Sequence, residues 1–247
     1  MPGPVGELDT EGVLAAYAVP AGVDRHLRLN FVSSVDGAVT LDGRSGGLST
    51  PGDKRLFGLL RDLADVILVG AGTVRDEGYG PPAHSPRRRA RRRALGLAEV
   101  PPYALVTNSL DLDPGSPLFT EAEARTVVIA PAGAPADRRA ALDPVADVVT
   151  AGEHRVDLHA ALDRLADRGL HRVLCEGGPA LFGGLLGAGL VDELCLTVSP
   201  LLAGPGPARI LGGPPLPAAP YGLDTQHVLE EDGALFLRYA VRRGPTG

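Results

Sequence analysis

Residues 172–190 read RVLCEGGPALFGGLLGAGL, and this stretch decides how the rest of the chain is interpreted. Residues 173–175 predict a short buried strand, and Pro179 marks the first turn of a helix, where a missing N–H costs nothing. Gly177 and Gly178 let a second backbone or a ligand approach closely because they carry no Cβ. The first N–H groups of a helix attract anions. The stretch therefore predicts either a phosphate cradle or a tight strand–helix turn without a ligand.

Glu176 stands between the strand and the glycines. In open α/β sheets, ligands bind at the carboxyl ends of the strands, where this residue is expected. A carboxylate next to a buried strand is costly unless it is hydrogen-bonded. Glu176 is therefore a candidate for a functional role.

Composition limits the classes of function. The chain has 247 residues, 44% of them hydrophobic, and a formal charge of −6, which argues against general affinity for nucleic acid or membrane surfaces. It has no apolar run near the roughly 18–20 residues of a membrane span, and its acidic N-terminus lacks the order of a secretory signal. Cys175 and Cys195 lie in apolar runs and are interpreted as buried free thiols. Together these features predict a cytoplasmic protein.

The first half of the chain predicts alternating strands and helices. A strand over 26–35 leads into a Ser-Val-Asp-Gly turn at 34–37, and Thr50 and Pro51 predict the start of a helix ending near Leu63. A strand over 66–69 is followed by Gly-Ala-Gly-Thr, which is a weak dinucleotide fingerprint because the third glycine is missing. Thr73 can cap a helix or hold a phosphate oxygen.

The second half predicts strands at 103–107, 126–130 and 147–150, and an amphipathic helix over 157–168. Strand-like runs then follow without helices between them, at 193–199, 226–230 and 235–241. The predicted fold is a single α/β domain with a mixed, mostly parallel central sheet flanked by helices, and with antiparallel C-terminal strands at its edge.

Residues 87–93 carry six arginines in seven positions. The run has no interleaved aromatic residues and belongs to an acidic chain. A solvated helix face is therefore the favoured interpretation, and a contribution to cofactor phosphate binding is the alternative.

The available chemistry is limited. The six histidines form no metal-ligand spacing with the cysteines, and neither a G-x-S-x-G nor a P-loop motif is present. Glycine turns and isolated polar groups at strand ends fit hydride transfer, in which a cofactor carries the chemistry. No metal site is expected.

Four motifs in order, S-V-D-G (34–37), D-V-I-L-V-G-A-G-T-V (65–74), E-G-G-P-A-L-F-G-G-L (176–185) and L-V-D-E-L (190–194), resemble the riboflavin-biosynthesis pyrimidine reductase family. This is the family of the RibD C-terminal reductase domain, which has a dihydrofolate-reductase-like fold. The resemblance implies a reductase domain over 26–242 behind an N-terminal arm at 1–25. It also implies a homodimer that uses NADPH to reduce the ribosyl group of 5-amino-6-(5-phosphoribosylamino)uracil. No deaminase domain precedes the motifs, so a stand-alone reductase is expected.

The resemblance also implies site residues. It assigns catalytic roles to Glu176 and Asp36, and substrate contacts to Asn30, Ser34 and Arg61. The implied cofactor contacts are Thr73, Glu77, Ser109, Val156, Gly177, Gly178, Pro179, Ala180, Leu181 and Phe182. Two simpler interpretations stay open, because Asp36 can be a turn former and Arg61 a helix-end charge.

Three departures from the family pattern affect the expected substrate. Glu77 replaces the usual Asp, and residues 46–48 (Gly-Gly-Leu) replace a Ser-x-Trp pattern. An arginine that would hold the substrate phosphate is replaced by Pro82, Ala83 or His84. Either the arginine run at 87–93 supplies that charge or the substrate differs, and a pterin such as dihydrofolate is the alternative substrate. A non-catalytic nucleotide-binding module is a third possibility.

Overall fold

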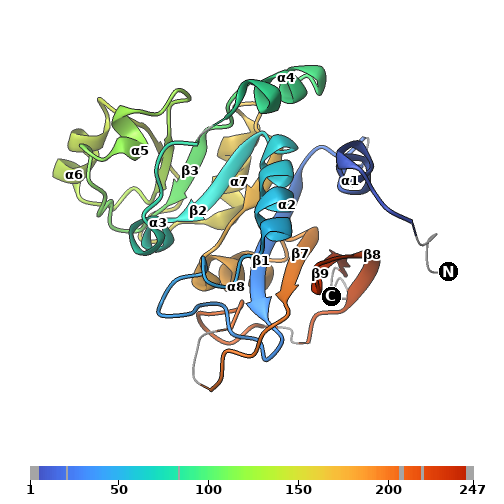
Figure 1. The fold of residues 1–247 in the computed structure, drawn as a ribbon. Coiled ribbons are helices and arrows are strands. Elements are labelled where there is room, and N and C mark those ends of the chain that lie inside the picture. Colours follow the sequence, from blue (N-terminus) through green and yellow to red (C-terminus); the bar gives the residue numbers. More distant parts are fainter. Residues whose placement is uncertain (1–5, 21, 83, 206–208, 218–219, 243–247) are drawn as a thin grey trace.

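The computed structural model describes residues 6–20, 22–82, 84–205, 209–217 and 220–242. Within these residues, one sheet of nine strands runs in the order β5-β4-β3-β2-β6-β1-β7-β9-β8 (Figure 1). The strands are β1 (His26–Ser34), β2 (Val66–Gly70), β3 (Tyr103–Val106), β4 (Val127–Ala130), β5 (Asp147–Thr150), β6 (Arg172–Cys175), β7 (Glu193–Ser199), β8 (Leu223–Glu231) and β9 (Ala234–Val241). The helices are α1 (Thr10–Ala16), α2 (Pro51–Asp62), α3 (Ala71–Glu77), α4 (Pro86–Ala94), α5 (Pro117–Thr120), α6 (Ala136–Leu142), α7 (Leu158–Ala166) and α8 (Pro179–Gly187).

The sheet confirms the predicted mixed, mostly parallel α/β architecture. Strand β1 lies between β6 and β7 and is parallel to both, with Leu29 opposite Cys175 on one side and Leu194 on the other. Only β9 runs against the other strands of the described sheet, because it pairs antiparallel with both β7 and β8. The expectation that the whole tail is antiparallel is therefore wrong for β7, which extends the parallel part of the sheet.

Helices cover both faces of the sheet, and the strands are consequently apolar on both sides. Along β2, Val66 and Leu68 pack into a core beneath α7 and α8, whereas Ile67 and Val69 pack into a second core with α3, α5 and α6. Figure 1 shows α2 and α3 on the side of the strands opposite α7 and α8. A third core joins α1 and α2 to the sheet near Leu174.

Helices α2 and α7, whose starts were predicted from the sequence, have ordinary capping residues. Thr50 caps α2 by accepting a hydrogen bond from the N–H of Asp53, and Pro51 occupies the first turn. Asp157 caps α7 through the N–H of Ala160. These signals fixed both helix starts to within one residue.

Three short helices, α1, α5 and α6, were not predicted. Helix α1 lies inside the expected N-terminal arm, and its Leu14, together with Tyr17 just beyond it, is buried in the third core. The described part of the arm is therefore packed against the domain, through one short helix whose pattern is too brief to recognise in sequence.

The arginine run forms α4, and the interpretation of a solvated face is wrong for three of its members. Arg92 is fully buried and donates hydrogen bonds to the carbonyls of Ala98, Arg61 and Ala64. Arg88 and Arg91 both contact the carboxylate of Asp62, which is completely buried. Carbonyls at the end of a helix lack internal donors, and α4 supplies these donors to the end of α2. The run therefore acts as a structural clamp.

Candidate active site

The turn between β6 and α8 depends on its two glycines. Gly177 has a φ of +107°, and a Cβ there would lie 3.2 Å from the ring of Phe31. A Cβ on Gly178 would lie 2.5 Å from the hydroxyl oxygen of Thr73, so any larger residue would have to displace that side chain. The N–H of Gly70 donates to the carbonyl of Gly177 at 2.9 Å, which ties the turn to the end of β2. Glycine is required here because α3 and β1 approach the turn so closely.

The N-terminus of α8 has no side-chain cap. Its N-cap, Gly178, has no side chain to accept the first helical N–H groups, and Pro179 has no N–H to offer. The backbone N–H groups of Ala180 and Leu181 are thus available to an anion at the positive end of the helix dipole. Phe182 has a different role, because its buried ring stacks on Phe31 at 5.2 Å and belongs to the core.

A pocket of about 430 Å³ opens beside this turn. It is formed by the middle of β1, the loop 39–49, the first half of α2, helix α3 with Tyr79 behind it, and the turn at 176–179. Its size is in the range of small-molecule sites. The pocket lies beside the middle of β1 and at the carboxyl ends of β2 and β6, the edge that the sequence predicts.

Glu176 lines the pocket and is held by two partners. Arg61 donates to its two oxygens from Nε at 2.6 Å and Nη2 at 2.7 Å, and the Tyr79 hydroxyl donates to Oε2 at 3.0 Å. The Glu176 side chain is 1% exposed and that of Arg61 is 15% exposed. Burial by itself would lower the pKa of Arg61, but the Glu176 carboxylate outweighs it and raises that pKa. Burial, reinforced by the same carboxylate, raises the pKa of Tyr79 well above 10, so its hydroxyl remains a donor.

Arg61 lies behind the pocket. Its guanidinium carbon is 4.3 Å from the centre of the Phe57 ring, and Phe57 lines the pocket while Arg61 does not. Arg61 can therefore be the helix-end charge that the sequence suggested, and it also orients the carboxylate of Glu176.

Of the three site residues expected on β1 and in the turn after it, one lies in the pocket and two lie outside it. Asn30 lines the pocket, whereas Ser34 and Asp36 are not among its lining residues. The Ser34 hydroxyl donates to Asp36, and the Asp36 carboxylate also accepts the N–H groups of Ala203 (3.1 Å) and Gly204 (2.8 Å). These bonds, that of Ser34 first, lower the pKa of Asp36 to about 2. This placement favours the turn-former interpretation of Asp36, which fastens the loop after β7 to the loop after β1.

The expected cofactor residues also fall into two groups. Thr73 and Glu77 line the pocket from α3; Thr73 lies inside that helix instead of capping it, and Glu77 accepts the N–H of Ser45 at 2.9 Å. Ser109 and Val156 lie beyond the pocket lining. They are brought near each other by Asn108, whose side chain accepts the N–H of Val156 at 2.9 Å.

Pro82, Ala83 or His84 stands where the family has an arginine for the substrate phosphate. Of these three residues, Ala83 lies outside the described residues. His84 is buried, with its ring 3.8 Å from the Asp62 carboxylate, and neither it nor Pro82 lines the pocket. Burial lowers the pKa of His84 to about 4, so this residue offers no positive charge at neutral pH.

Among the pocket residues that were missed from sequence are Lys54, Phe57 and Tyr79. Two of them carry a detectable signal. Lys54, Phe57 and Arg61 are spaced three and four residues apart along α2, which places them on one helical face. Tyr79 has no such signal, because it lies in the irregular segment after α3.

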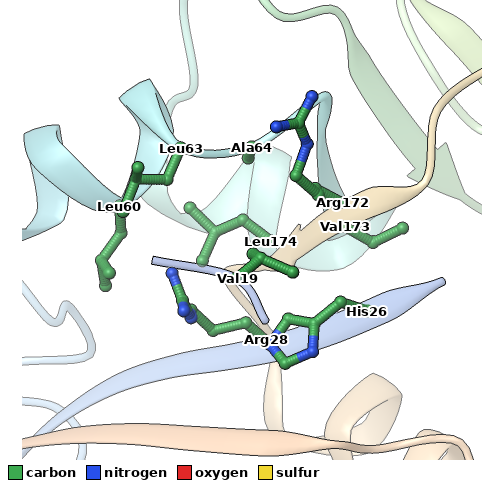
Figure 2. A pocket seen from close by; sticks show the side chains of 9 residues that line it. All are labelled: Val19, His26, Arg28, Leu60, Leu63, Ala64, Arg172, Val173 and Leu174. Atoms are coloured by element: carbon green, nitrogen blue, oxygen red, sulfur yellow. The ribbon is translucent and has the colours of Figure 1, made fainter. Parts of the chain in front are cut away.

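A second cavity, of about 10 Å³, lies at the other edge of the sheet, where β1 and β6 begin. Figure 2 shows His26 and Arg28 from β1 and Arg172 from β6 beside apolar side chains at the end of α2. The volume has room for about one water molecule. Within the described ranges, no group of three or more His, Cys, Asp or Glu side chains is placed to hold a metal ion. None of the described helices is long and apolar enough to cross a membrane.

Comparisons with known proteins agree on one family. The family model described as the RibD C-terminal domain matches residues 25–231. A 2,5-diamino-6-ribosylamino-4(3H)-pyrimidinone 5′-phosphate reductase from Methanothermobacter thermautotrophicus is 34% identical over 183 residues, 74% of this chain and 81% of the relative. A relative of the same name from Archaeoglobus fulgidus is 32% identical over 177 residues, 71% of this chain and 80% of the relative. Among solved structures, a pyrimidine reductase-like protein from Corynebacterium diphtheriae is 30% identical with a TM-score of 0.83, covering 94% of this chain and 98% of that one.

Proposed function

Because the chain belongs to the RibD C-terminal domain family, we propose that it is an NADPH-dependent reductase of a phosphoribosylamino-pyrimidine in riboflavin biosynthesis. The proposal assigns residues 26–242 to one reductase domain. The observation that carries it is the position of Glu176: this carboxylate is fixed by Arg61 and Tyr79 at the wall of a pocket that adjoins an uncapped helix N-terminus.

The turn at 177–178 and the start of α8 fit a nicotinamide dinucleotide. The uncapped N–H groups at Ala180 and Leu181 suit a pyrophosphate, and Gly178 lets Thr73 approach the turn closely. Ser109 and Val156 would lie toward the adenosine. Arg138 donates to the carbonyl of Ser109 at 3.1 Å, and the exposed Arg155 adjoins Val156. Two nearby arginines support a preference for the 2′-phosphate of NADPH.

The proposed reaction opens the sugar ring of the substrate. When bound, NADPH supplies the hydride that ends on C1′ of the ribosyl group, and it is oxidised to NADP⁺. The bond between C1′ and the ring oxygen O4′ breaks, and O4′ takes one proton, which gives the ribityl product. Glu176 would accept hydrogen bonds from the N–H groups of the pyrimidine, and Asn30 would complement the base edge because its amide both donates and accepts.

Two substrates of this class differ in the group at C2 of the pyrimidine. The motif resemblance implies the uracil compound, whereas the two archaeal relatives are named for the 2,5-diamino-pyrimidinone. The amide of Asn30 can face either a C2 oxygen or a C2 amino group. Both compounds are therefore candidate substrates.

The proposal includes a homodimer in the cytoplasm. Strand β8 is an edge of the described sheet, and the hairpin that it forms with β9 exposes Leu223, Val228 and Leu235, an apolar surface suited to a second copy. Cys175 and Cys195 are free and buried, as in proteins of reducing compartments. Light scattering should give twice the mass of one chain.

The decisive experiment is steady-state NADPH oxidation with the two pyrimidine phosphates and dihydrofolate as separate substrates, with NADH as a control. We expect turnover with at least one pyrimidine phosphate. Turnover with dihydrofolate alone would favour the pterin alternative, and NADPH binding without any turnover would favour a non-catalytic module.

A further inference from the structure

Lys54 is the single lysine of the chain, and it lines the pocket from the first turn of α2. Its side chain is exposed to solvent. Within the described part of the chain, no hydrogen bond or ion pair engages it. A lysine without a partner at the wall of a pocket is available to an anionic ligand.

Lys54 is positively charged, whereas the side chains around it in the pocket include several carboxylates. The lining residues that the structure describes include four acids, Asp53, Asp76, Glu77 and Glu176, and no arginine. Three of these acids already have partners: Asp53 accepts from the Ser49 hydroxyl, Glu77 from a backbone N–H, and Glu176 from Arg61 and Tyr79. A phosphate entering this acidic pocket requires a cation, and Lys54 is the one at its wall.

Arg61, the one cation among the substrate contacts expected from sequence, already has another partner. Arg61 uses Nε and Nη2 to hold Glu176, and its guanidinium lies against Phe57 outside the pocket lining. Binding a phosphate with these same donors would leave the buried Glu176 carboxylate uncompensated, which is costly.

Lys54, Phe57 and Arg61 follow one another along one face of α2. Lys54 lies one turn before Phe57, and Phe57 lies one turn before Arg61 with its Glu176 partner. A planar base beside Phe57 and Glu176 would leave the sugar chain to extend along the helix toward its first turn. The phosphate would then meet Lys54.

We propose that Lys54 binds the phosphate group of the substrate and selects phosphorylated over unphosphorylated sugars. The inference rests on the proposed function for the identity of the rest of the substrate. It assigns to α2 a specificity role that neither the glycine turn nor the Arg61–Glu176 pair can supply.

The test compares Lys54→Met with Lys54→Arg and with the matched control Arg55→Ala. Arg55 is the neighbouring exposed cation, but it pairs with Glu231 and does not line the pocket. For the phosphorylated pyrimidine, Lys54→Met should raise KM about 10- to 100-fold, the usual effect of losing one charge-assisted bond. Lys54→Arg should recover most of the affinity. The dephosphorylated nucleoside should show the same KM in all four proteins, and the Kd of NADPH should not change.

A binding measurement separates this inference from the proposed reaction. Calorimetry of the NADPH-loaded protein with ribose 5-phosphate and with ribose should show a preference for the phosphate that Lys54→Met abolishes, even if no pyrimidine is turned over. Absence of that preference in the wild-type protein, or its persistence in Lys54→Met, would overturn the inference. Turnover of a pyrimidine phosphate with an unchanged KM in Lys54→Met would leave the reductase intact and remove Lys54 from it.

Discussion

Arg61 holds Glu176 through two nearly equal hydrogen bonds, of 2.6 Å and 2.7 Å, across 115 positions of sequence. The pair connects α2 to the turn after β6, so one contact serves both the packing of the helix and the orientation of the pocket carboxylate. Bidentate arginine–carboxylate pairs fix direction as well as distance. Stability and activity should therefore depend on this pair together.

Glu176→Gln should reduce both activity and stability. The amide keeps the shape of the side chain but removes the charge that Arg61 faces. We expect kcat/KM to fall roughly 10- to 100-fold and the free energy of unfolding to fall by about 1–3 kcal/mol. Activity within about twofold of wild type, measured on protein that is folded at the assay temperature, would exclude a direct substrate role for Glu176.

Arg61→Met should be more destabilising than Glu176→Gln, because it leaves an ionised carboxylate buried without its partner. The expected cost is about 3–5 kcal/mol. Combining Arg61→Met with Glu176→Gln should cost less stability than the sum of the two single changes. Urea unfolding of the four proteins measures this coupling, and additive losses would show that the two residues act independently.

Tyr79→Phe tests the second partner of Glu176. Loss of one hydroxyl hydrogen bond to a carboxylate should lower kcat/KM by roughly 3- to 30-fold while the fold persists. Because the pKa of Tyr79 lies well above 10, its ionisation should produce no alkaline limb in the pH–rate profile below pH 10. A limb in that range that disappears in Tyr79→Phe would contradict the role of a permanently protonated donor.

Gly178→Ala tests the cofactor cradle. The new methyl group would lie 2.5 Å from the Thr73 hydroxyl oxygen, so we expect the Kd of NADPH to rise at least about tenfold. Adding Thr73→Ala removes that oxygen and should recover the melting temperature but not the affinity, because Thr73 is itself one of the expected cofactor contacts. NADPH titration and thermal unfolding of both variants measure the two effects, and wild-type affinity in Gly178→Ala would place the cofactor elsewhere.

Much of the fold could be predicted from local signals. The apolar runs of the parallel strands, the Thr50 cap and the glycine turn at 177–178 each act within a few residues, and the structure confirms the elements they predict. The strand–glycine–helix unit also located the carboxyl edge of the sheet correctly. Helices α1, α5 and α6 are four to seven residues long, too short for a helical period to become visible.

Side-chain partners were harder to predict, because they join distant segments. The pairing of Arg61 with Glu176 and the contact of Asp36 with residues 203–204 depend on how the loops meet. The arginine run was misinterpreted for the same reason, since the buried Asp62 and the carbonyls of Gly58 and Arg61 that accept its hydrogen bonds lie on α2, about 30 positions away. The positive charge of the run therefore did not indicate whether α4 faces solvent or packs against α2.

A buried charge cluster far from the pocket should control stability in acid. Glu193 contacts His26, Arg28 and Arg238. Burial alone would raise the pKa of the Glu193 carboxyl, but these neighbours outweigh it and lower the pKa below its ordinary value of 4.5. Because the folded pKa is depressed, the stabilisation is complete above about pH 4.5 and is lost as pH falls below that value.

Glu193→Gln should therefore cost about 3–5 kcal/mol at pH 7, and the difference from wild type should shrink as pH falls from 5 to 3. The matched control is Glu231→Gln, an exposed partner of Arg55 that should cost about 1 kcal/mol or less. Urea unfolding at several pH values measures both. A cost for Glu193→Gln that stays constant across this range would contradict the assignment.

The most direct test of the central claim follows the hydride itself. NADPH carrying deuterium on the transferred position of its nicotinamide is incubated with the protein and each phosphoribosylamino-pyrimidine, and the product is analysed by mass spectrometry and NMR. The account predicts one ribityl product molecule per NADPH oxidised, with a single deuterium on C1′. NADPH oxidation without deuterium on C1′, or no oxidation with either pyrimidine phosphate, would contradict it.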